Sequence, residues 1–342
     1  MRIIHNDCSG GAGYYIVQGR KNAVEALGWK MLLWDGSQPE KTFEEFEPDL
    51  FITDVRFRHR IPSRIRRKQT VVVATVDQWA SPWAYPENAR QGYRTKWRDV
   101  RWIRKLDPEL LFHHTSPAGI ERGWRNWSLK ESRRVLSLPL AGDTIRHRDE
   151  GFDEKFACDV GFVGGWWPNK APGLRDYLLS YAGAYNTIIY GPGWPDGVSR
   201  ADSIADGSLN RLYRSATVTP CVHEPHARIY GYEVTERLFK VPLAGGFTIS
   251  DPVACIHGEG YFKEDEILVA QSPEDMADKV DYFVRHPEER APFIEKARQR
   301  VLAEHTYFHR LAALLAELGF AGELQELKEK ISGWGHDTRS LD

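Results

Sequence analysis

The chain has 342 residues, and its 46 Lys and Arg residues nearly balance its 48 Asp and Glu residues, for a formal charge of −2 at pH 7. A content of 42% hydrophobic and 27% charged residues is ordinary for globular proteins, which excludes a disordered chain, a collagen and a heptad rod. The longest uncharged apolar runs are strand-sized, and the N-terminus carries one Arg and a very short apolar run. We therefore expect neither a membrane-spanning helix nor a secretory signal. The four cysteines form no C-x-x-C pair, which favours a cytoplasmic protein with free thiols.

The first half of the chain alternates short apolar runs with amphipathic stretches. The apolar runs predict strands at 2–7, 30–36, 50–56, 71–79, 109–116 and 134–140. One predicted helix follows the first strand and reaches about Leu27, and another opens at Pro117. Strands that alternate with helices indicate βαβ units and therefore a parallel sheet.

The same pattern restarts after a polar stretch at 142–155. Strands with their turns are predicted at 156–167, 186–194, 217–222, 246–250 and 266–272. Helices are predicted at 174–183, 209–214 and 233–244, and a long helical tract at 288–318. The fold class is therefore α/β, with two Rossmann-like domains whose parallel sheets face each other across a crevice, the default ligand site.

These patterns divide the chain into four parts, in line with a length that suits about two domains. They are an N-terminal Rossmann-like domain at 1–141, a C-terminal Rossmann-like domain at 152–310, a C-terminal helix at 311–330 and a frayed tail at 331–342. Packing of the C-terminal helix back on the first domain is one option for this arrangement.

Three glycine-rich turns follow predicted strands. The first, S-G-G-A-G, contains Gly10, Gly11 and Gly13; the others contain Gly164 and Gly165, with Lys170 nearby, and Gly191. Glycine lets backbone N–H groups approach an anion at a helix N-terminus, although any tight strand–helix turn also favours glycine. Three such turns at strand ends fit a nucleotide that lies across the crevice.

The densest group of polar residues lies between residues 221 and 247. A loop offers His223, Glu224, His226 and Arg228, and the predicted helix places Glu233, Glu236 and Arg237 on one face. A carboxylate can accept two ribose hydroxyls and a guanidinium can bind phosphate, whereas the alternative is an ordinary surface Glu–Arg pair. His223 and His226 have no evident third ligand, so we expect no metal site.

The neutral total charge hides a basic segment. Between Arg56 and Lys105 there are fourteen Lys and Arg residues against three acids, with four tryptophans among them. Either this is a solvated basic face, or it binds an anionic partner such as a phosphorylated acceptor, an anionic membrane surface or nucleic acid.

Residues 159–310 resemble the C-terminal domain of group 1 glycosyltransferases of the CgeB-like branch, named after a spore-maturation protein. The resemblance is carried by D-V-G-F-V-G-G (159–165), I-Y-G-P-G-W (189–194), E-R-L-F-K-V-P-L-A-G-G-F-T-I-S-D (236–251) and matching segments within 262–280, 286–290 and 297–310. It implies the GT-B fold, with a nucleotide-sugar donor, UDP- or GDP-linked, held mainly by the second domain. It implies no catalytic metal and no other cofactor, and it makes the first domain the acceptor domain.

The resemblance also points to site residues. Together with the glycine turns and the polar segment described above, it leads us to expect donor contacts from Gly10, Gly11, Gly13, Gly164, Gly165, Lys170, Gly191, His223, Arg228, Glu233, Glu236 and Arg237. Relatives usually carry a donor-contacting Glu where this chain has Lys240. We expect Glu236, one helical turn earlier, to take the place of that Glu. The segment V-T-E-R also resembles the T-E-K segment of α-1,3-fucosyltransferases, in which Glu holds ribose and the cation holds phosphate, so we favour Glu236 and Arg237.

The sequence is therefore interpreted as a metal-independent glycosyltransferase, in which an acceptor hydroxyl attacks the anomeric carbon of the sugar. An inverting enzyme needs a base, for which Asp77 leads and Asp7 and His5 follow; a retaining enzyme needs none. The preferred acceptor is an acidic or phosphorylated glycan, with nucleic acid second. A nucleotide-sugar epimerase and a non-catalytic nucleotide-sugar-binding protein on the same scaffold are the alternatives.

Overall fold

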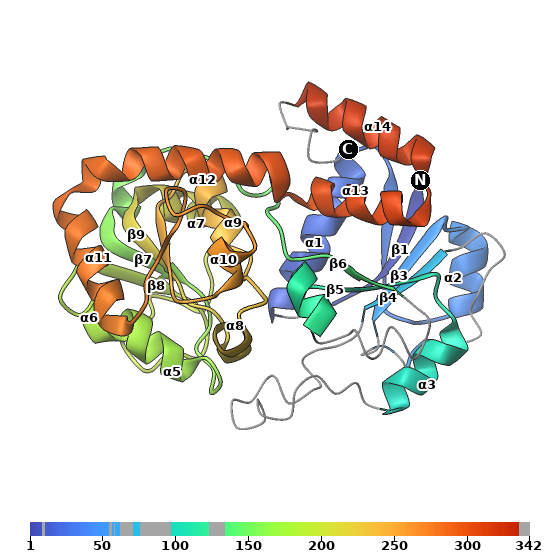
Figure 1. Cartoon of the computed structure of the whole chain (residues 1–342), viewed down its shortest axis with the longest axis horizontal. Helices are drawn as coiled ribbons and strands as arrows, with labels where there is room; N and C mark the ends of the chain where they lie inside the picture. The colour runs from blue at the N-terminus through green and yellow to red at the C-terminus, as the bar shows by residue number, and fades with distance from the viewer. Residues whose placement is uncertain are drawn as a thin grey trace. The chain divides into compact units, whose positions relative to one another are not determined.

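The computed structural model describes residues 1–8, 11–54, 57, 59–61, 71–75, 97–122 and 134–334. The chain divides into two compact units, coloured by residue number in Figure 1: Met1–Leu140 with Tyr307–Asp342, and Ala141–Thr306. The helix that begins at Tyr307 thus belongs to the first unit, although the sequence-based division assigns residues up to 310 to the second domain.

The first unit is built on a six-stranded sheet in which every neighbouring pair is parallel. Its strand order is β2-β1-β3-β4-β5-β6. The strands are β1 (Arg2–Asn6), β2 (Lys30–Trp34), β3 (Leu50–Asp54), β4 (Val71–Thr75), β5 (Leu110–His113) and β6 (Val135–Ser137). Their near-continuous apolar sequences suit strands that are covered on both faces.

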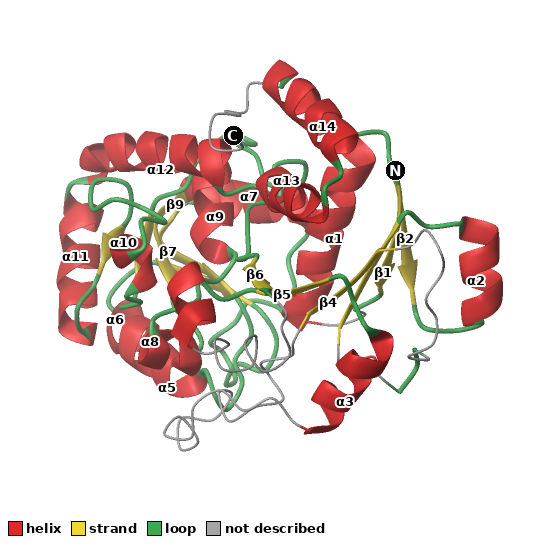
Figure 2. Cartoon of the chain, turned by 45° about the vertical axis from the view of Figure 1, so that its right-hand side comes forward, coloured by secondary structure: helices red, strands yellow, loops and turns green. Residues whose placement is uncertain are grey.

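Helices cover both faces of this sheet (Figure 2). On one face, Phe43 and Trp102 from two helices pack with the strand residues Ile4, Phe51 and Leu111. The other face is covered by the first helix and by the first of the two C-terminal helices. The helices are α1 (Gly11–Ala26), α2 (Pro39–Phe46), α3 (Trp97–Leu106), α13 (Tyr307–Leu318) and α14 (Ala321–Gly333).

The second unit has a five-stranded parallel sheet of order β11-β10-β9-β7-β8. Its strands are β7 (Cys158–Val163), β8 (Thr187–Tyr190), β9 (Ala216–Cys221), β10 (Thr248–Ser250) and β11 (Leu268–Val269). Each sequence-based strand of this half overlaps one of these strands, although β9 begins one residue earlier than predicted, and the stretches that follow them are the predicted glycine turns and loops.

Helices also cover both faces of the second sheet. Leu174, Met276 and Phe283 pack with Phe162 on one face, and Leu212 packs with strand residues on the other. The helical elements are α5 (Ala171–Leu174), a π-helical turn (Arg175–Leu179), α6 (Ser180–Ala182), α7 (Asp206–Ser215), α8 (Pro225–Tyr230), α9 (Arg237–Leu243), α10 (Cys255–Gly258), α11 (Pro273–Arg285) and α12 (Ala291–Glu304). The unit is thus a doubly wound α/β layer structure.

The helical tract predicted at 288–318 is two helices, α12 and α13, with a break at His305 and Thr306. The backbone nitrogen of Gly142 donates to the carbonyl of His305 at 2.7 Å, and Gly142 forms a β-bridge with Thr306. The ring of His305 bonds the carbonyl of Tyr261 at 2.8 Å. Contacts with distant segments therefore end the helix here, and the prediction of one continuous tract was wrong.

Parallel strands place all their carboxyl ends at one edge of a sheet, and open α/β sheets bind ligands at that edge. In the second unit this edge is formed by Val163, Cys221 and Ser250 with the loops that follow them. None of the helices in the described part of the chain is long and apolar enough to cross a membrane.

Candidate functional site

His5 lies on β1 and uses both ring nitrogens inside the first unit. It is 6% exposed, with Nδ1 at 2.8 Å from the carbonyl of Asn6 and Nε2 at 2.9 Å from Nη1 of Arg20. A guanidinium can only donate, so Nε2 accepts and Nδ1 carries the ring proton. For His5 to act as a base, Arg20 must first leave Nε2.

The first glycine turn is described in part. Gly11 has a φ of +58°, and a Cβ on Gly13 would clash with Sγ of Cys8. The backbone conformation at Gly11 and the packing of Cys8 at Gly13 therefore explain these two glycines without a ligand. Asp7 is partly exposed. Two other predicted residues, Gly10 and Asp77, lie outside the described residues, as does most of the basic segment.

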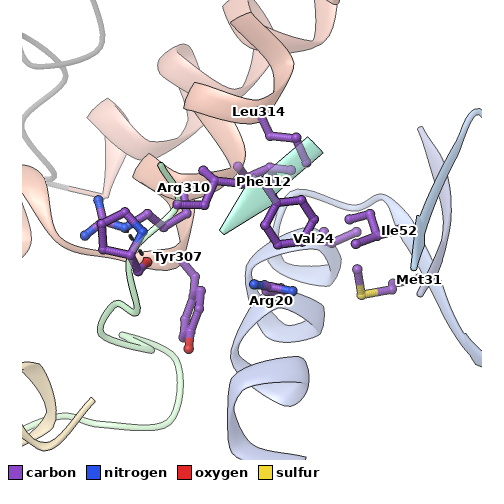
Figure 3. Close-up of a pocket in the computed structure, with 11 residues that line it drawn as sticks. Arg20, Val24, Met31, Ile52, Phe112, Tyr307, Arg310 and Leu314 are labelled. Carbon is purple, nitrogen blue, oxygen red and sulfur yellow. Dashed lines mark hydrogen bonds between the residues drawn. The ribbon is translucent and has the colours of Figure 1, made fainter. Parts of the chain in front are cut away.

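The first unit also contains a cavity between α1, α13 and the sheet (Figure 3). Its lining is mostly apolar, from residues such as Val24, Phe112 and Leu314, with Arg20 and Arg310 at its sides. The volume of about 30 Å³ is far below the roughly 300–1,000 Å³ of typical ligand pockets. This cavity is too small for a nucleotide, so the candidate site lies elsewhere.

In the second unit, the two predicted glycine turns pack against each other. Gly191 has a φ of +142°, and a Cβ there would clash with the backbone carbonyl of Gly164. The amide of Gly164 donates to the carbonyl of Tyr190 at 2.8 Å, so this N–H is already used within the protein. A Cβ on Gly165 would meet Pro192 at ordinary contact distance. The turns thus shape the carboxyl edge of the sheet.

A buried ion-pair cluster lies beside these turns. Asp251 is fully buried, and its Oδ1 lies 2.5 Å from Nδ1 of His223 while Oδ2 accepts from the His223 backbone nitrogen at 2.9 Å and from Arg228 at 3.2 Å. Burial alone would raise the pKa of Asp251, but His223 and Arg228 outweigh it and hold that pKa below its ordinary value. Asp251 is therefore the anion that organises this cluster.

Arg228 and Lys170 approach the same loop from other elements. The guanidinium of Arg228 stands over the ring of Tyr177, 5.7 Å from its centroid, and lies where a side chain on Gly173 would be. Lys170 is 6% exposed, and its Nζ lies 3.1 Å from Oε1 of Glu224. Both cations are thus already paired with carboxylates, Arg228 with Asp251 and Lys170 with Glu224.

The predicted helix at 233–244 begins only at Arg237, so the expectation that Glu233, Glu236 and Arg237 share one helix face was wrong. Glu233 stands in the preceding loop, where it bonds His226 at 3.1 Å. Glu236 precedes the helix and forms an ion pair of 2.9 Å with Lys240. Lys240 thus binds the very carboxylate that we expected to replace the family's Glu.

Arg237 is buried, at 8% exposed, and no carboxylate pairs with it among the residues that the structure describes. It donates to the carbonyls of Val163 at 2.6 Å and Val222 at 3.4 Å, and its guanidinium lies 4.4 Å from the ring centre of Phe162. The neighbouring thiol of Cys221 stays neutral, because burial raises its pKa to about 12. Arg237 is therefore a buried cation at the carboxyl edge of the sheet, with no anionic partner among the described residues.

The described residues around Arg237 and Asp251 contain no cluster of potential metal ligands. The group of potential metal ligands found among the described residues is His286, Glu288 and Glu289, all exposed and on a different segment. Exposed acidic groups are common without a metal, so we assign no function to it.

Asp251 and Glu224 were not among the predicted site residues. Asp251 stands 28 residues after His223, and sequence spacing does not reveal that pairing. The available signal was its position directly after the strand G-F-T-I-S, where α/β proteins place polar site residues. The sequence analysis lists Glu224 in the H-E-P-H loop, but it assigns no donor contact to this residue.

Comparisons with known proteins agree with this architecture. A family model described as "Glycosyl transferase-like" matches residues 175–316. A comparison with curated proteins gives no match.

Three solved structures illustrate the likeness, each covering 95% of this chain and matched over 99% of its own. They are sucrose-phosphate synthase from Thermosynechococcus elongatus (12% identity, TM-score 0.61), HepE from Anabaena in complex with UDP and glucose (11%, 0.57) and T4 phage BGT in complex with its UDP-glucose substrate (9%, 0.55). At such low identity the likeness concerns the fold alone. It confirms the predicted α/β class with parallel sheets, and the chain has the GT-B fold with its two Rossmann-like domains.

Proposed function

We propose that this protein is a glycosyltransferase whose second unit binds a nucleotide-sugar donor. The observation that carries the proposal is Arg237, a buried guanidinium at the carboxyl edge of a Rossmann-like sheet that no carboxylate in the described part of the chain pairs with. Burying a charge is costly unless it is paired, so such a cation is best explained by an anionic ligand. A diphosphate fits, because guanidinium groups bind its oxygens with charge-assisted hydrogen bonds.

The comparisons support this class of ligand and reaction. The matched family model spans residues 175–316, which include His223, Arg237 and Asp251. Two similar structures hold UDP-glucose, or UDP and glucose. We therefore put UDP-sugars first and GDP-sugars second, and we retain the CgeB-like branch as the proposed relationship.

In the proposed reaction, an acceptor hydroxyl attacks the anomeric carbon of the sugar and the nucleoside diphosphate leaves. Arg237 stabilises the negative charge that develops on the leaving group, and its preorganised position makes this effect large. Either an inverting or a retaining course is compatible with this role. For an inverting course, Asp77 is the first proposed base, and Asp7 and His5 follow.

We further propose that turnover needs no divalent metal, because protein cations supply the positive charge at the diphosphate. The sequence contains no Asp-x-Asp triplet, the usual ligand for a metal-bound diphosphate. Activity that survives EDTA supports this part. Complete loss of turnover in EDTA, restored by Mn²⁺ or Mg²⁺, contradicts it.

The proposed acceptor is an acidic or phosphorylated glycan. What supports it is the charge of about +11 between Arg56 and Lys105, set against an acidic remainder of the chain. Nucleic acid is the second candidate, because tryptophans stand among the basic residues and can stack on unpaired bases.

The test of the function is incubation with UDP- and GDP-sugars, followed by analysis of the products. Slow release of free sugar and nucleoside diphosphate supports a transferase. Accumulation of an altered nucleotide sugar indicates an epimerase, and binding without turnover indicates a non-catalytic protein. Either of these last two results contradicts the proposal.

A further inference from the structure

Two successive residues after β9, His223 and Glu224, each keep one buried polar atom without a hydrogen-bond partner. These atoms are Nε2 of His223 and Oε2 of Glu224, and neither has a partner in the described parts of the two units. Native proteins leave few buried polar atoms unsatisfied, because a buried atom that loses its hydrogen bond to water and gains no other destabilises the fold. The missing partners are therefore best sought outside the chain.

The ring of His223 is fixed so that only Nε2 remains available. The 2.5 Å contact between Nδ1 and Oδ1 of Asp251 requires a proton on Nδ1, because a carboxylate only accepts. Asp251 is itself held in place, because Arg228 and the His223 backbone nitrogen also donate to its carboxylate. His223 is 1% exposed, so bulk water does not solvate Nε2.

Glu224 is the carboxylate of this loop that retains an unused oxygen. Its Oε1 pairs with Lys170 at 3.1 Å, while its buried Oε2 has no hydrogen-bond partner among the residues that the structure describes. The other two carboxylates of the segment are engaged, Glu233 with His226 and Glu236 with Lys240.

A hydroxyl group is the chemistry that satisfies both atoms. It can donate to the carboxylate oxygen of Glu224, and it can either donate to or accept from Nε2 of His223. A phosphate oxygen does not fit at Glu224, because two anionic acceptors repel each other.

We propose that His223 and Glu224 bind hydroxyl groups of the donor's sugar rings, with Asp251 as the residue that positions His223. This inference rests on the proposed function, which supplies a nucleotide sugar as the ligand. The ribose and the transferred sugar are the two possible sources of these hydroxyls. The proposal also accounts for Lys240, which stands where relatives usually carry a Glu. In this protein the hydroxyl-binding carboxylate lies in the loop before the helix, and Lys240 neutralises the carboxylate of Glu236.

The experiment measures dissociation constants by calorimetry for wild type, His223→Asn and Glu224→Gln. Asn keeps a donor for Asp251 but removes Nε2, and Gln keeps an oxygen for Lys170 but turns the second oxygen into a donor. The probes are pyrophosphate, UDP, 2′-deoxy-UDP and UDP-glucose, with the corresponding GDP, 2′-deoxy-GDP and GDP-mannose series.

In both variants we expect pyrophosphate to bind within about twofold of its wild-type affinity. The affinity for the probe that carries the recognised hydroxyl should fall about tenfold or more. Loss of the preference for the ribo- over the 2′-deoxynucleotide identifies the ribose as the source. Loss of the preference for the nucleotide sugar over the nucleoside diphosphate identifies the transferred sugar.

The controls are His147→Asn and Glu266→Gln, which alter a buried histidine held through Nδ1 by Asn210 and a buried glutamate paired with Arg300. These variants should bind every probe as wild type does. Unchanged preferences in both His223→Asn and Glu224→Gln, with folding verified by melting temperature, overturn the inference. A wild-type protein that binds none of the probes overturns the proposed function itself, before any variant is compared.

Discussion

The carboxylate of Asp251 holds His223 at two points, with Oδ1 2.5 Å from the ring nitrogen Nδ1 and Oδ2 2.9 Å from the backbone nitrogen. The two residues follow neighbouring parallel strands, β9 and β10, at the same edge of the sheet. The pairing therefore fixes a loop and a ring orientation together.

We predict that Asp251→Asn lowers the free energy of unfolding by about 3–5 kcal/mol at pH 7, because it breaks the ion pair with Arg228 and leaves that guanidinium uncompensated. Urea titration measures this value. The control Asp265→Asn removes an exposed pair with Lys296, which water screens, so it should leave stability nearly unchanged. Equal effects of the two substitutions would contradict the role given to Asp251.

The same pair has a defined pH dependence. The pKa of Asp251 is lowered from its ordinary 3.8 in the folded protein, so its stabilising contribution is complete above that value. It is lost as the pH falls further and the carboxylate becomes protonated. The difference in unfolding free energy between wild type and Asp251→Asn should therefore shrink below about pH 3.8.

His147 predicts a second, earlier acid transition. Burial, followed by the nearby charge of Lys240, lowers its pKa from 6.5 to about 3. Between these values the unfolded chain binds a proton that the folded chain does not, so stability falls as the pH falls. From pH 6 to pH 4 the slope should be about 1.4 kcal/mol per pH unit steeper in wild type than in His147→Asn. Parallel pH profiles of the two proteins would contradict this.

Gly191 tests whether the packed glycine turns are needed for folding. With a φ of +142° and the carbonyl of Gly164 in the place of a Cβ, Gly191→Ala should cost at least about 1–3 kcal/mol of stability. A Cβ on Gly207, at the start of α7, would meet no atom within 4 Å. Gly207→Ala should be neutral or slightly stabilising, and a similar loss in both variants would rule out the steric explanation.

The basic segment is predicted to contribute to acceptor binding. Charge reversal of Arg64, Arg66, Arg67 and Lys68 to Glu should raise the acceptor KM, more steeply at low salt, while donor affinity stays unchanged. The measurement is steady-state kinetics with each substrate varied in turn. An unchanged acceptor KM would mean that this segment is only a solvated surface.

Local sequence was sufficient to predict most of the fold. The runs V-V-V-A-T at 71–75 and T-V-T-P-C at 217–221 coincide with strands, because apolar and β-branched residues suit a sheet covered on both faces. The helical sequence pattern continues across His305, but the helix ends there. Gly142 donates to the backbone carbonyl of His305, and the His305 ring bonds the carbonyl of Tyr261. Such contacts are not visible in a local window.

The sequence identified several residues of the candidate site, but it did not reveal which of them contact one another. Arg237 and His223 were identified from their chemistry and from the family resemblance. Their roles separate only in three dimensions, where Asp251 binds His223 and where Arg237 meets carbonyl groups in place of a carboxylate. Spacing alone suggested a shared helix face for Glu233 and Arg237, but the helix begins at Arg237.

The most direct test of the account is the affinity of Arg237→Gln for pyrophosphate and UDP, measured by calorimetry beside wild type. The control is Arg300→Gln, which alters a guanidinium already paired with Glu266 and Glu304. If Arg237 binds the donor diphosphate, its loss removes a charge-assisted contact of about 1.5–3 kcal/mol and weakens both ligands roughly tenfold to more than a hundredfold, while Arg300→Gln binds as wild type does. Wild-type affinity for both ligands in a folded Arg237→Gln protein would contradict the central claim.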